Sequence, residues 1–234
     1  MNIILTGDLH FTDRPNDAYR FDLFPFLRKK IKQHQVGAVV LLGDITDFKD
    51  EHPARLVNRI ASEIEKVSKL CPVYIIRGNH DCKDPNHPFF AFLDKYEDVH
   101  FFTHPVVKDI GDAKALFLPH SRHPQQEWTA DLLDQDCQYI FCHQTFKDCI
   151  VENGTRMQEG ISPRFFEKER GAPKTCRIYS GDIHVPQKLG PVTYAGAPYH
   201  IRFGDKFDPR ILLLKDGKEL NLRLSTVKKH SVTI

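Results

Sequence analysis

The sequence contains five short apolar runs, and each of them ends in a cluster of polar residues. The runs are rich in β-branched and aromatic residues, which is typical of buried strands. They occupy residues 3–5, 38–42, 73–76, 139–141 and 177–179. Segments 20–34 and 53–70, which separate the first three runs, carry apolar residues at helical spacing. This alternation predicts an α/β protein with parallel strands and helical crossovers.

The second half of the chain has fewer helical segments. Further strands are expected at residues 100–102, 115–118 and 192–194. Segment 211–224 predicts a hairpin that turns at Asp216-Gly217, because Asp-Gly favours the tight turn that matches strand twist. Two sheets packed together and flanked by helices account for this order. Segment 146–175 has no clear strand and connects two of the polar clusters, and long loops beside a site are often functional.

The five polar clusters combine the side chains that a pair of divalent metals needs. They are Asp8-Leu9-His10, Gly43-Asp44-Ile45-Thr46-Asp47, Gly78-Asn79-His80-Asp81, Cys142-His143-Gln144 and Gly181-Asp182-Ile183-His184. A single Asp-x-His is weak evidence, because it occurs by chance in many chains. Five clusters in one order, each at the same end of a predicted strand, favour a metal site over unrelated loops.

Composition limits the classes of protein that remain. With 41% hydrophobic and 27% charged residues, the 234-residue chain fits one globular domain over residues 1–234. No apolar run approaches the ~20 residues that span a bilayer, and the N-terminus lacks a basic signal region. We therefore expect a cytoplasmic protein without a membrane partner. The six cysteines lack zinc-knuckle spacing and are interpreted as reduced core thiols rather than disulfides.

The charge balance gives no general sign of a nucleic-acid partner. The 33 basic residues face 31 acidic ones, whereas nucleic-acid-binding proteins usually carry a basic field. Local basic clusters occur at residues 28–32, at 164–177 and at Lys228-Lys229. The first lies on a predicted helix, where a solvated face is the commoner interpretation.

In their order and context, the clusters resemble those of the calcineurin-like metallophosphoesterases. That family's pattern is Asp-x-His, Gly-Asp-x-x-Asp, Gly-Asn-His-(Asp/Glu), a lone His and Gly-His-x-His, and the match covers residues 1–204. The segments Tyr194-Ala195-Gly196-Ala197-Pro198 and Arg202-Phe203-Gly204-Asp205 are similar to the branch of SbcD-type DNA repair nucleases. The resemblance implies a four-layer αββα sandwich of two mixed sheets. The chain looks like a compact, phage-type member without a separate capping domain.

The resemblance also implies roles for the residues of the five clusters. One metal is expected on Asp8, His10 and His184 and a second on Asn79 and His143, with Asp44 between them. Oxygen and imidazole ligands suit manganese, iron or zinc better than calcium, and Mn²⁺ is our first choice, with Mg²⁺ also open. Two metals about 3.5–4 Å apart bind a phosphate and lower the pKa of a bridging water.

His80 is the expected catalytic residue outside the metal ligands. It follows Asn79 directly, and the equivalent histidine of the family contacts the phosphoryl oxygens or protonates the leaving oxygen. Asp47 is the expected partner that orients His80. Asp81 either shares in this role or caps the turn.

One position departs from the family pattern. Where the family has Gly-His-x-His, this chain has Gly181-Asp182-Ile183-His184. Asp182 either ligates the second metal through oxygen, which would shift preference toward manganese or magnesium, or bonds a neighbouring ligand and leaves that metal weaker. We favour direct ligation.

The substrate is less constrained than the metal chemistry. His200 and Arg202 follow the 194–198 segment and are candidates for contacting a substrate phosphate. The first hypothesis is a DNA nuclease, exo- or endonuclease. The alternative is a phosphodiesterase or phosphatase acting on nucleotides or other small phosphoesters. A protein phosphatase is disfavoured because Phe48-Lys49 stands where those enzymes have Arg-Gly.

A third hypothesis is a catalytically silent scaffold. Such members lose the catalytic histidine, and His80 is present. Among partners, we expect DNA and leave a homodimer open. No segment supports a coiled-coil ATPase partner of the kind that SbcD-type nucleases have.

Overall fold

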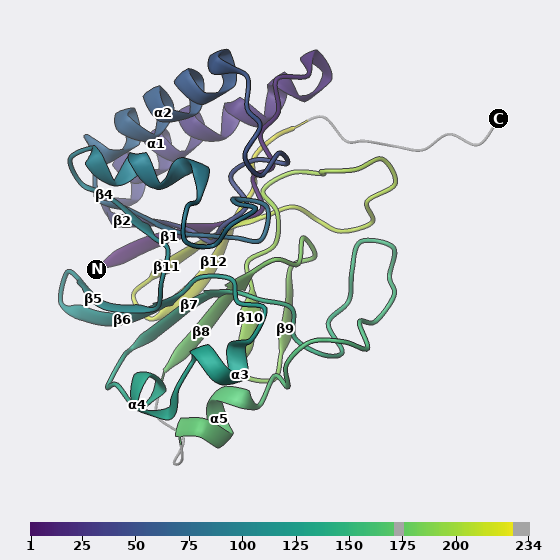
Figure 1. Cartoon of the computed structure of the whole chain (residues 1–234). Coiled ribbons are helices and arrows are strands. Elements are labelled where there is room, and N and C mark those ends of the chain that lie inside the picture. The colour runs from purple at the N-terminus through teal and green to yellow at the C-terminus, as the bar shows by residue number, and fades with distance from the viewer. Residues whose placement is uncertain (171–175, 227–234) are drawn as a thin grey trace.

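The computed structural model describes residues 1–170 and 176–226 (Figure 1). Lys174, in the basic segment 164–177, and the Lys228-Lys229 pair lie outside the described residues. The described strands form two sheets of six strands each. The sheets pack face to face, and helices cover the outer face of each one (Figure 1). This arrangement confirms the predicted four-layer αββα sandwich.

The first sheet has the strand order β12-β11-β1-β2-β3-β4. β1 to β4 are parallel, and β11 and β12 extend the β1 edge as an antiparallel hairpin. The hairpin turns at Asp216 and Gly217, with φ of 50° and 73°, as the Asp-Gly pair predicted. The strands are β1 (Asn2–Thr6), β2 (Val36–Leu41), β3 (Val73–Ile76), β4 (Val99–Phe102), β11 (Ile211–Lys215) and β12 (Lys218–Leu222).

The second sheet has the order β5-β6-β7-β8-β10-β9. Its four inner strands are parallel, and β5 and β9 pair antiparallel at the two edges. The strands are β5 (Val106–Ile110), β6 (Ala113–Leu118), β7 (Tyr139–His143), β8 (Arg177–Gly181), β9 (Gln187–Leu189) and β10 (Val192–Tyr194).

The helices fall into two groups. The 3-10 helices η1 (Pro15–Asp22) and η2 (Phe89–Lys95) and the helices α1 (Leu23–His34) and α2 (Ala54–Ser68) accompany the first sheet. The short helices α3 (Pro124–Glu127), α4 (Ala130–Leu133) and α5 (Phe165–Arg170) lie beside the second sheet (Figure 1). Among the described residues, no helix combines the length and the apolar character that crossing a membrane requires.

Alternate side chains of the central strands belong to different cores. Ile3 and Leu5 of β1 belong to the core that also holds Phe141 of the second sheet, whereas Ile4 packs with residues of α1 and α2. Ile140, next to Phe141 on β7, belongs to a third core under the short helices. Both faces of these strands are therefore buried, which explains why each strand is apolar at consecutive positions of the sequence.

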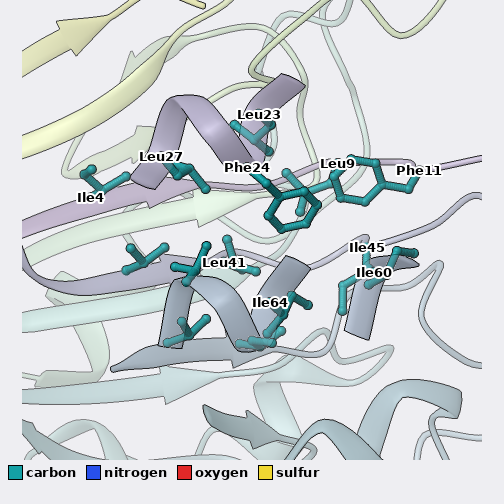
Figure 2. Packing of buried hydrophobic residues seen from close by; sticks show 14 of the residues in the cluster. Ile4, Leu9, Phe11, Leu23, Phe24, Leu27, Leu41, Ile45, Ile60 and Ile64 are labelled. Carbon is teal, nitrogen blue, oxygen red and sulfur yellow. The ribbon is translucent and has the colours of Figure 1, made fainter. Parts of the chain in front are cut away.

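The core beneath α1 and α2 fixes these helices on the first sheet. Leu23, Phe24 and Leu27 come from α1, and Ile60 and Ile64 come from α2 (Figure 2). Each is at most 1% exposed, and burying such a side chain contributes about 1.5–3 kcal/mol. Replacing Ile60 by alanine would remove part of this packing and leave a cavity, at a cost of about 2–5 kcal/mol.

Three expectations need adjustment. The helix predicted over 20–34 begins as the 3-10 helix η1, and α1 starts at Leu23. The edge strands β5 and β9 were not predicted, because most of their residues are partly exposed and give little apolar signal. Segment 146–164 holds isolated bridges, and α5 follows it.

All six cysteines are free, and five of them are buried, which confirms the expectation of reduced thiols. A single domain over residues 1–234 without a capping domain stays a prediction.

Candidate metal centre

The polar clusters meet where the parallel strands of the two sheets end. Within each sheet the parallel strands carry their polar residues at the same edge, and the sheets pack face to face. Asp8 and His10 follow β1, Asp44 follows β2, Asn79 follows β3, His143 ends β7, and Asp182 and His184 follow β8. The structure therefore brings together all seven predicted metal ligands.

Four of these residues have a left-handed backbone conformation, which non-glycine residues rarely adopt. The angle φ is 53° at Asp8, 45° at His10, 55° at Asp44 and 83° at Asp182. The backbone N–H groups of Leu9 and His10 donate to the carbonyl of Asp44 at 2.8 and 2.9 Å, which ties two of the loops together. Conformations of this kind cost about 1–3 kcal/mol each and cluster at functional sites.

Three glycines make room for the ring of His143. A Cβ atom at Gly43 would lie 2.5 Å from Nδ1 of His143, and one at Gly181 would lie 2.9 Å from the same atom. A Cβ atom at Gly78 would lie 2.9 Å from Cε1 of the ring. Each separation is too short for a side chain, so the glycine of each of these clusters has a steric role at the site.

His10 and His184 direct their Nε2 atoms toward each other, 3.1 Å apart. Nδ1 of His10 lies 2.8 Å from Oδ1 of Asp47, and Nδ1 of His184 lies 2.7 Å from Oε1 of Glu152. Because a carboxylate accepts hydrogen bonds, Nδ1 holds the proton of the neutral ring and Nε2 presents a lone pair. Ligand atoms of Asp8, His10 and His184 lie within 4.8 Å of one another, so these residues form one candidate ligand set.

His143 is oriented by a backbone carbonyl. Its Nδ1 donates to the carbonyl of Leu42 at 2.6 Å, which leaves Nε2 as the acceptor nitrogen. Nε2 lies 2.9 Å from the side-chain amide of Asn79. Ligand atoms of Asp8, Asp44 and His143 also lie within 4.8 Å of one another. A second candidate set therefore adjoins the first.

Asp44 lies between the two sets. Its Oδ2 is 3.7 Å from Nε2 of His10, and its Oδ1 is 3.5 Å from Nε2 of His143. The backbone N–H of His80 donates to Oδ1 of Asp44 at 2.9 Å and fixes the carboxylate. This position suits the bridging role expected for Asp44. Asp8 also has a ligand atom in both sets.

Asp182 lies on the His143 side of the centre. Its Oδ1 is 3.7 Å from Nε2 of His143, and the hydroxyl of Thr145 donates to its Oδ2. Its backbone N–H donates to Oδ1 of Asp8 at 2.9 Å. The carboxylate therefore stands near the second set, where direct ligation was expected. Its place as a ligand stays a prediction.

His80 and Asp47 are near each other, and Asp47 also contacts His10. Nδ1 of His80 lies 3.4 Å from the backbone carbonyl of Asp47, whereas the Asp47 carboxylate contacts His10. Ligand atoms of His10, Asp47 and His80 lie within 4.8 Å of one another, so the carboxylate is near both rings. The role of Asp47 in orienting His80 stays a prediction. Burial raises the pKa of Asp47, but the hydrogen bond and charge of His10 lower it by more.

Asp81 is a fully buried structural residue. Its carboxylate accepts hydrogen bonds from the backbone N–H groups of Asp44, Ile45 and Gly78, at 2.7–2.9 Å. These three backbone donors engage both of its oxygens. Of the two roles left open for Asp81, the structure supports the one that caps the turn.

A cavity of about 660 Å³ opens over the candidate centre. His10, Asp44, Asn79 and His80 line it together with residues of the long loop and of the segment after β10. Both of these segments lie on the right-hand side of Figure 1.

The two predicted substrate contacts differ in their placement. Arg202 is exposed and lines the cavity. His200 does not line it: the ring is buried, and its Nε2 donates to the carbonyl of Phe207 at 2.9 Å. This placement disagrees with the expectation for His200, because the fold uses its ring to hold the segment after β10.

A model of the calcineurin-like phosphoesterases matches residues 1–186, which contain all five polar clusters. The chain belongs to the calcineurin-like phosphoesterase family. Members of this family normally bind two divalent metals, and the family assignment makes the protein a hydrolase of phosphoesters. The resemblance in the sequence is thereby confirmed.

Two viral relatives and one solved structure are similar to this calcineurin-like phosphoesterase. An inferred phosphoesterase, 244L of Invertebrate iridescent virus 6, is 24% identical over 91% of this chain and 75% of its own length. Exonuclease subunit 1 of Enterobacteria phage T4 is 22% identical over 90% of this chain, which spans only 63% of that relative. The fold matches GAP50, an anchor in the inner membrane complex of Plasmodium, with a TM-score of 0.58, 11% identity and coverage of 99% and 91%.

The charges at the centre suit the divalent metals that the family binds. Oδ2 of Asp8 is buried and has no hydrogen-bond partner among the described residues. Burial lowers the pKa of His143, but the carboxylates of Asp44, Asp182 and Asp8 raise it by more, to about 9. A buried excess of negative charge requires a positive partner. Oxygen and imidazole atoms are the donors, as manganese, iron or zinc would need.

Two residues of the centre were not predicted. Glu152 lies in the loop 146–164, and no motif surrounds it in the sequence. Arg20 is buried and donates to the carbonyls of His10 and Ile201, which links the first polar cluster to the segment after β10. Glu152 contacts His184, and Arg20 contacts Ile201, so each joins segments that are far apart in the sequence. The functional expectation for the loop was the one signal that could have led to Glu152.

Proposed function

We propose that the protein is a metal-dependent phosphodiester hydrolase that acts on DNA. Asp8, His10 and His184 would hold one metal, Asn79, His143 and Asp182 a second, and Asp44 both. Two such metals bind the phosphate, activate a water and stabilise the negative charge that develops on the oxygens. Manganese is the metal we propose first, because carboxylate and amide oxygens accompany the histidines.

His80 would supply a proton to the leaving oxygen. It is partly exposed at the cavity, and its backbone N–H is fixed on Asp44 at 2.9 Å. Its Nδ1 faces the carbonyl of Asp47, so the imidazolium form of the ring is the form that can give a proton to substrate, and it gives it from Nε2. The leaving oxygen of a phosphodiester departs poorly without a proton, and a general acid contributes about 10²–10⁴-fold.

The rim of the cavity carries the argument for a nucleic-acid substrate. Phe203 lines the cavity, and its side chain is 70% exposed. Arg202 stands beside it in the chain and lines the same cavity. An exposed aromatic ring can stack on a nucleobase. An arginine guanidinium can donate two parallel hydrogen bonds to one phosphate. The similarity to a phage exonuclease subunit supports the same proposal.

Hydrolysis of small phosphoesters is the second candidate. A volume of about 660 Å³ is within the range of small-molecule sites. A nucleotide or another small ester would fill it without contacts beyond the rim. The free thiols suit a reducing compartment, so we place either activity in the cytoplasm.

A direct comparison of substrates tests the proposal. Manganese-supported assays would be run on linear duplex DNA, single-stranded DNA and a small chromogenic phosphodiester, with chelator and His80→Ala controls. The proposal expects degradation of DNA that both controls abolish. Hydrolysis of the small ester alone would establish the second candidate instead. Absence of activity on all three, with no metal bound, would indicate a scaffold.

A further inference from the structure

A second groove adjoins the cavity of the metal centre. Its volume is about 290 Å³, and Arg14, Arg55 and Arg59 line it beside Asp13. We call it the arginine groove. Arg14 precedes η1, whereas Arg55 and Arg59 lie on α2. Arg14 also lines the cavity over the metal centre, so the groove and the cavity share this residue.

The guanidinium groups of the groove are exposed and not neutralised by ion pairs. Arg14, Arg55 and Arg59 are all exposed. Among the side chains that the structure describes, the arginines that pair with carboxylates are Arg20, Arg28, Arg164 and Arg223. Against three positive groups, Asp13 is the one carboxylate that lines the groove. The groove therefore carries a net positive charge beside a centre that is itself lined by carboxylates.

Aromatic rings hold two of the three groups in place. The guanidinium of Arg59 lies 3.7 Å from the centre of the Phe21 ring, and that of Arg14 lies 5.8 Å from the centre of the Phe48 ring. Phe21 is buried and stacks on Phe11 at 4.6 Å. Contacts of this kind orient a guanidinium and leave its N–H groups free to bind an anion.

We propose that the arginine groove binds backbone phosphates of a DNA strand whose scissile phosphate lies at the metal centre. This inference rests on the proposed function and deepens it. A guanidinium matches the geometry of a phosphate, and a strand presents phosphates at regular intervals. A small monoester or diester has a single phosphate, which the metal centre already takes. The groove thus distinguishes a polymeric substrate from a small one.

The groove can be tested by binding in the His80→Ala background, where the strand stays intact. Affinity for a fluorescent single-stranded oligonucleotide would be measured with Mn²⁺ over a range of salt concentrations. R55Q/R59Q removes both groups on α2 but keeps much of each side chain. Affinity at low salt should fall about tenfold, and the slope of log affinity against log salt should decrease by about 1.4, or 0.7 for each phosphate contact.

Two further double variants make the test specific. R55K/R59K keeps both charges and should retain the salt slope, although affinity falls because lysine lacks the guanidinium fork. K29Q/K32Q removes two exposed charges from α1, which lie outside the groove, and should bind like the parent. Thermal melting of each variant reports whether it is folded.

The outcomes separate this inference from the proposed function. If the oligonucleotide is cleaved by the wild type but bound equally by R55Q/R59Q and K29Q/K32Q, the groove inference is wrong and the nuclease proposal stands. If the folded wild type neither binds nor cleaves the oligonucleotide while it hydrolyses a small ester, both are wrong.

Discussion

Oε1 of Glu152 lies 2.7 Å from Nδ1 of His184, a candidate metal ligand. The loop that carries Glu152 is anchored by Gln187, whose side chain pairs with both backbone groups of Ile150. Burial raises the pKa of Glu152, but the hydrogen bond and charge of His184 lower it by more, to about 2. The ionised carboxylate therefore fixes the ring of His184 so that Nε2 faces the centre.

Removing this carboxylate should weaken the metal set around His184. Glu152→Ala is expected to lose about 10–100-fold in Mn²⁺ affinity, because a carboxylate behind a ligating histidine orients the ring and raises its basicity. Glu152→Gln should lose less, since its amide oxygen still accepts from Nδ1. Isothermal titration calorimetry measures the effect. Glu159→Gln, an exposed change in the same loop, is the control. Wild-type affinity in Glu152→Ala would contradict the assigned role.

Asp182 should decide which metal the second set prefers. Asp182→His restores the residue that the family pattern has at this position, and it exchanges a hard oxygen ligand for an imidazole. The ratio of manganese-supported to zinc-supported activity is expected to fall. Asp182→Asn keeps the size of the side chain and suits the positive φ of 83°. It should weaken the second metal through loss of charge.

The metal preference can be followed by initial rates at a series of Mn²⁺ and Zn²⁺ concentrations. Equal preference in the wild type and in both variants would show that Asp182 is not a ligand. The structure would then leave it as the hydrogen-bond partner of Thr145.

His80 and Asp44 should differ in what their loss removes. His80→Ala is expected to bind metal normally and lose about 10²–10⁴-fold in kcat, because only the proton donor is lost. Asp44→Ala should lose both metal binding and turnover, because its carboxylate lies between the two sets. Metal content by mass spectrometry and single-turnover rates give both quantities. A His80→Ala variant with undiminished kcat would remove the assignment.

The ion pairs of Glu63 predict a pH-dependent contribution to stability. Glu63 on α2 pairs with Arg28 of α1 and with Lys66, the latter at 2.7 Å. Partial burial raises the pKa of Glu63, but Lys66 and Arg28 lower it by more. A lowered pKa in the folded state means that the stabilisation is present at neutral pH and is lost as pH falls below the ordinary value of 4.5.

Glu63→Gln should therefore reduce the free energy of unfolding at neutral pH by about 0.5 kcal/mol. The difference should shrink as acid protonates the wild-type carboxyl. Urea unfolding at several pH values measures it, with the exposed Glu97→Gln as the control. A difference that is the same at neutral and acid pH would show that charge is not its origin.

The strands of the two sheets could be predicted from the sequence because a strand that is buried on both faces is apolar throughout. Ile3, Ile4 and Leu5 all lie in a core, so their run is apolar throughout. β9 gave no such signal, because it has two partly exposed residues and one exposed residue at a sheet edge. Its formation depends on pairing with β10, which a local pattern does not report.

The candidate metal ligands could be predicted from the sequence for a related reason. Asp44 and Asn79 directly follow apolar runs or their glycines, so position in the chain determines position at the sheet edge. The contacts that orient the candidate ligands could not be predicted from the sequence. Asp47 contacts His10, and Glu152 reaches His184 from a loop without strands. These pairs join segments that are brought together only by the complete fold.

The most direct test is an anomalous diffraction map of crystals grown with Mn²⁺. Two anomalous peaks about 3.5–4 Å apart are expected. One should lie against Asp8 and His184, the other against Asn79 and His143, and the carboxylate of Asp44 should contact both. A single peak, or peaks away from these residues, would contradict the account of a two-metal centre.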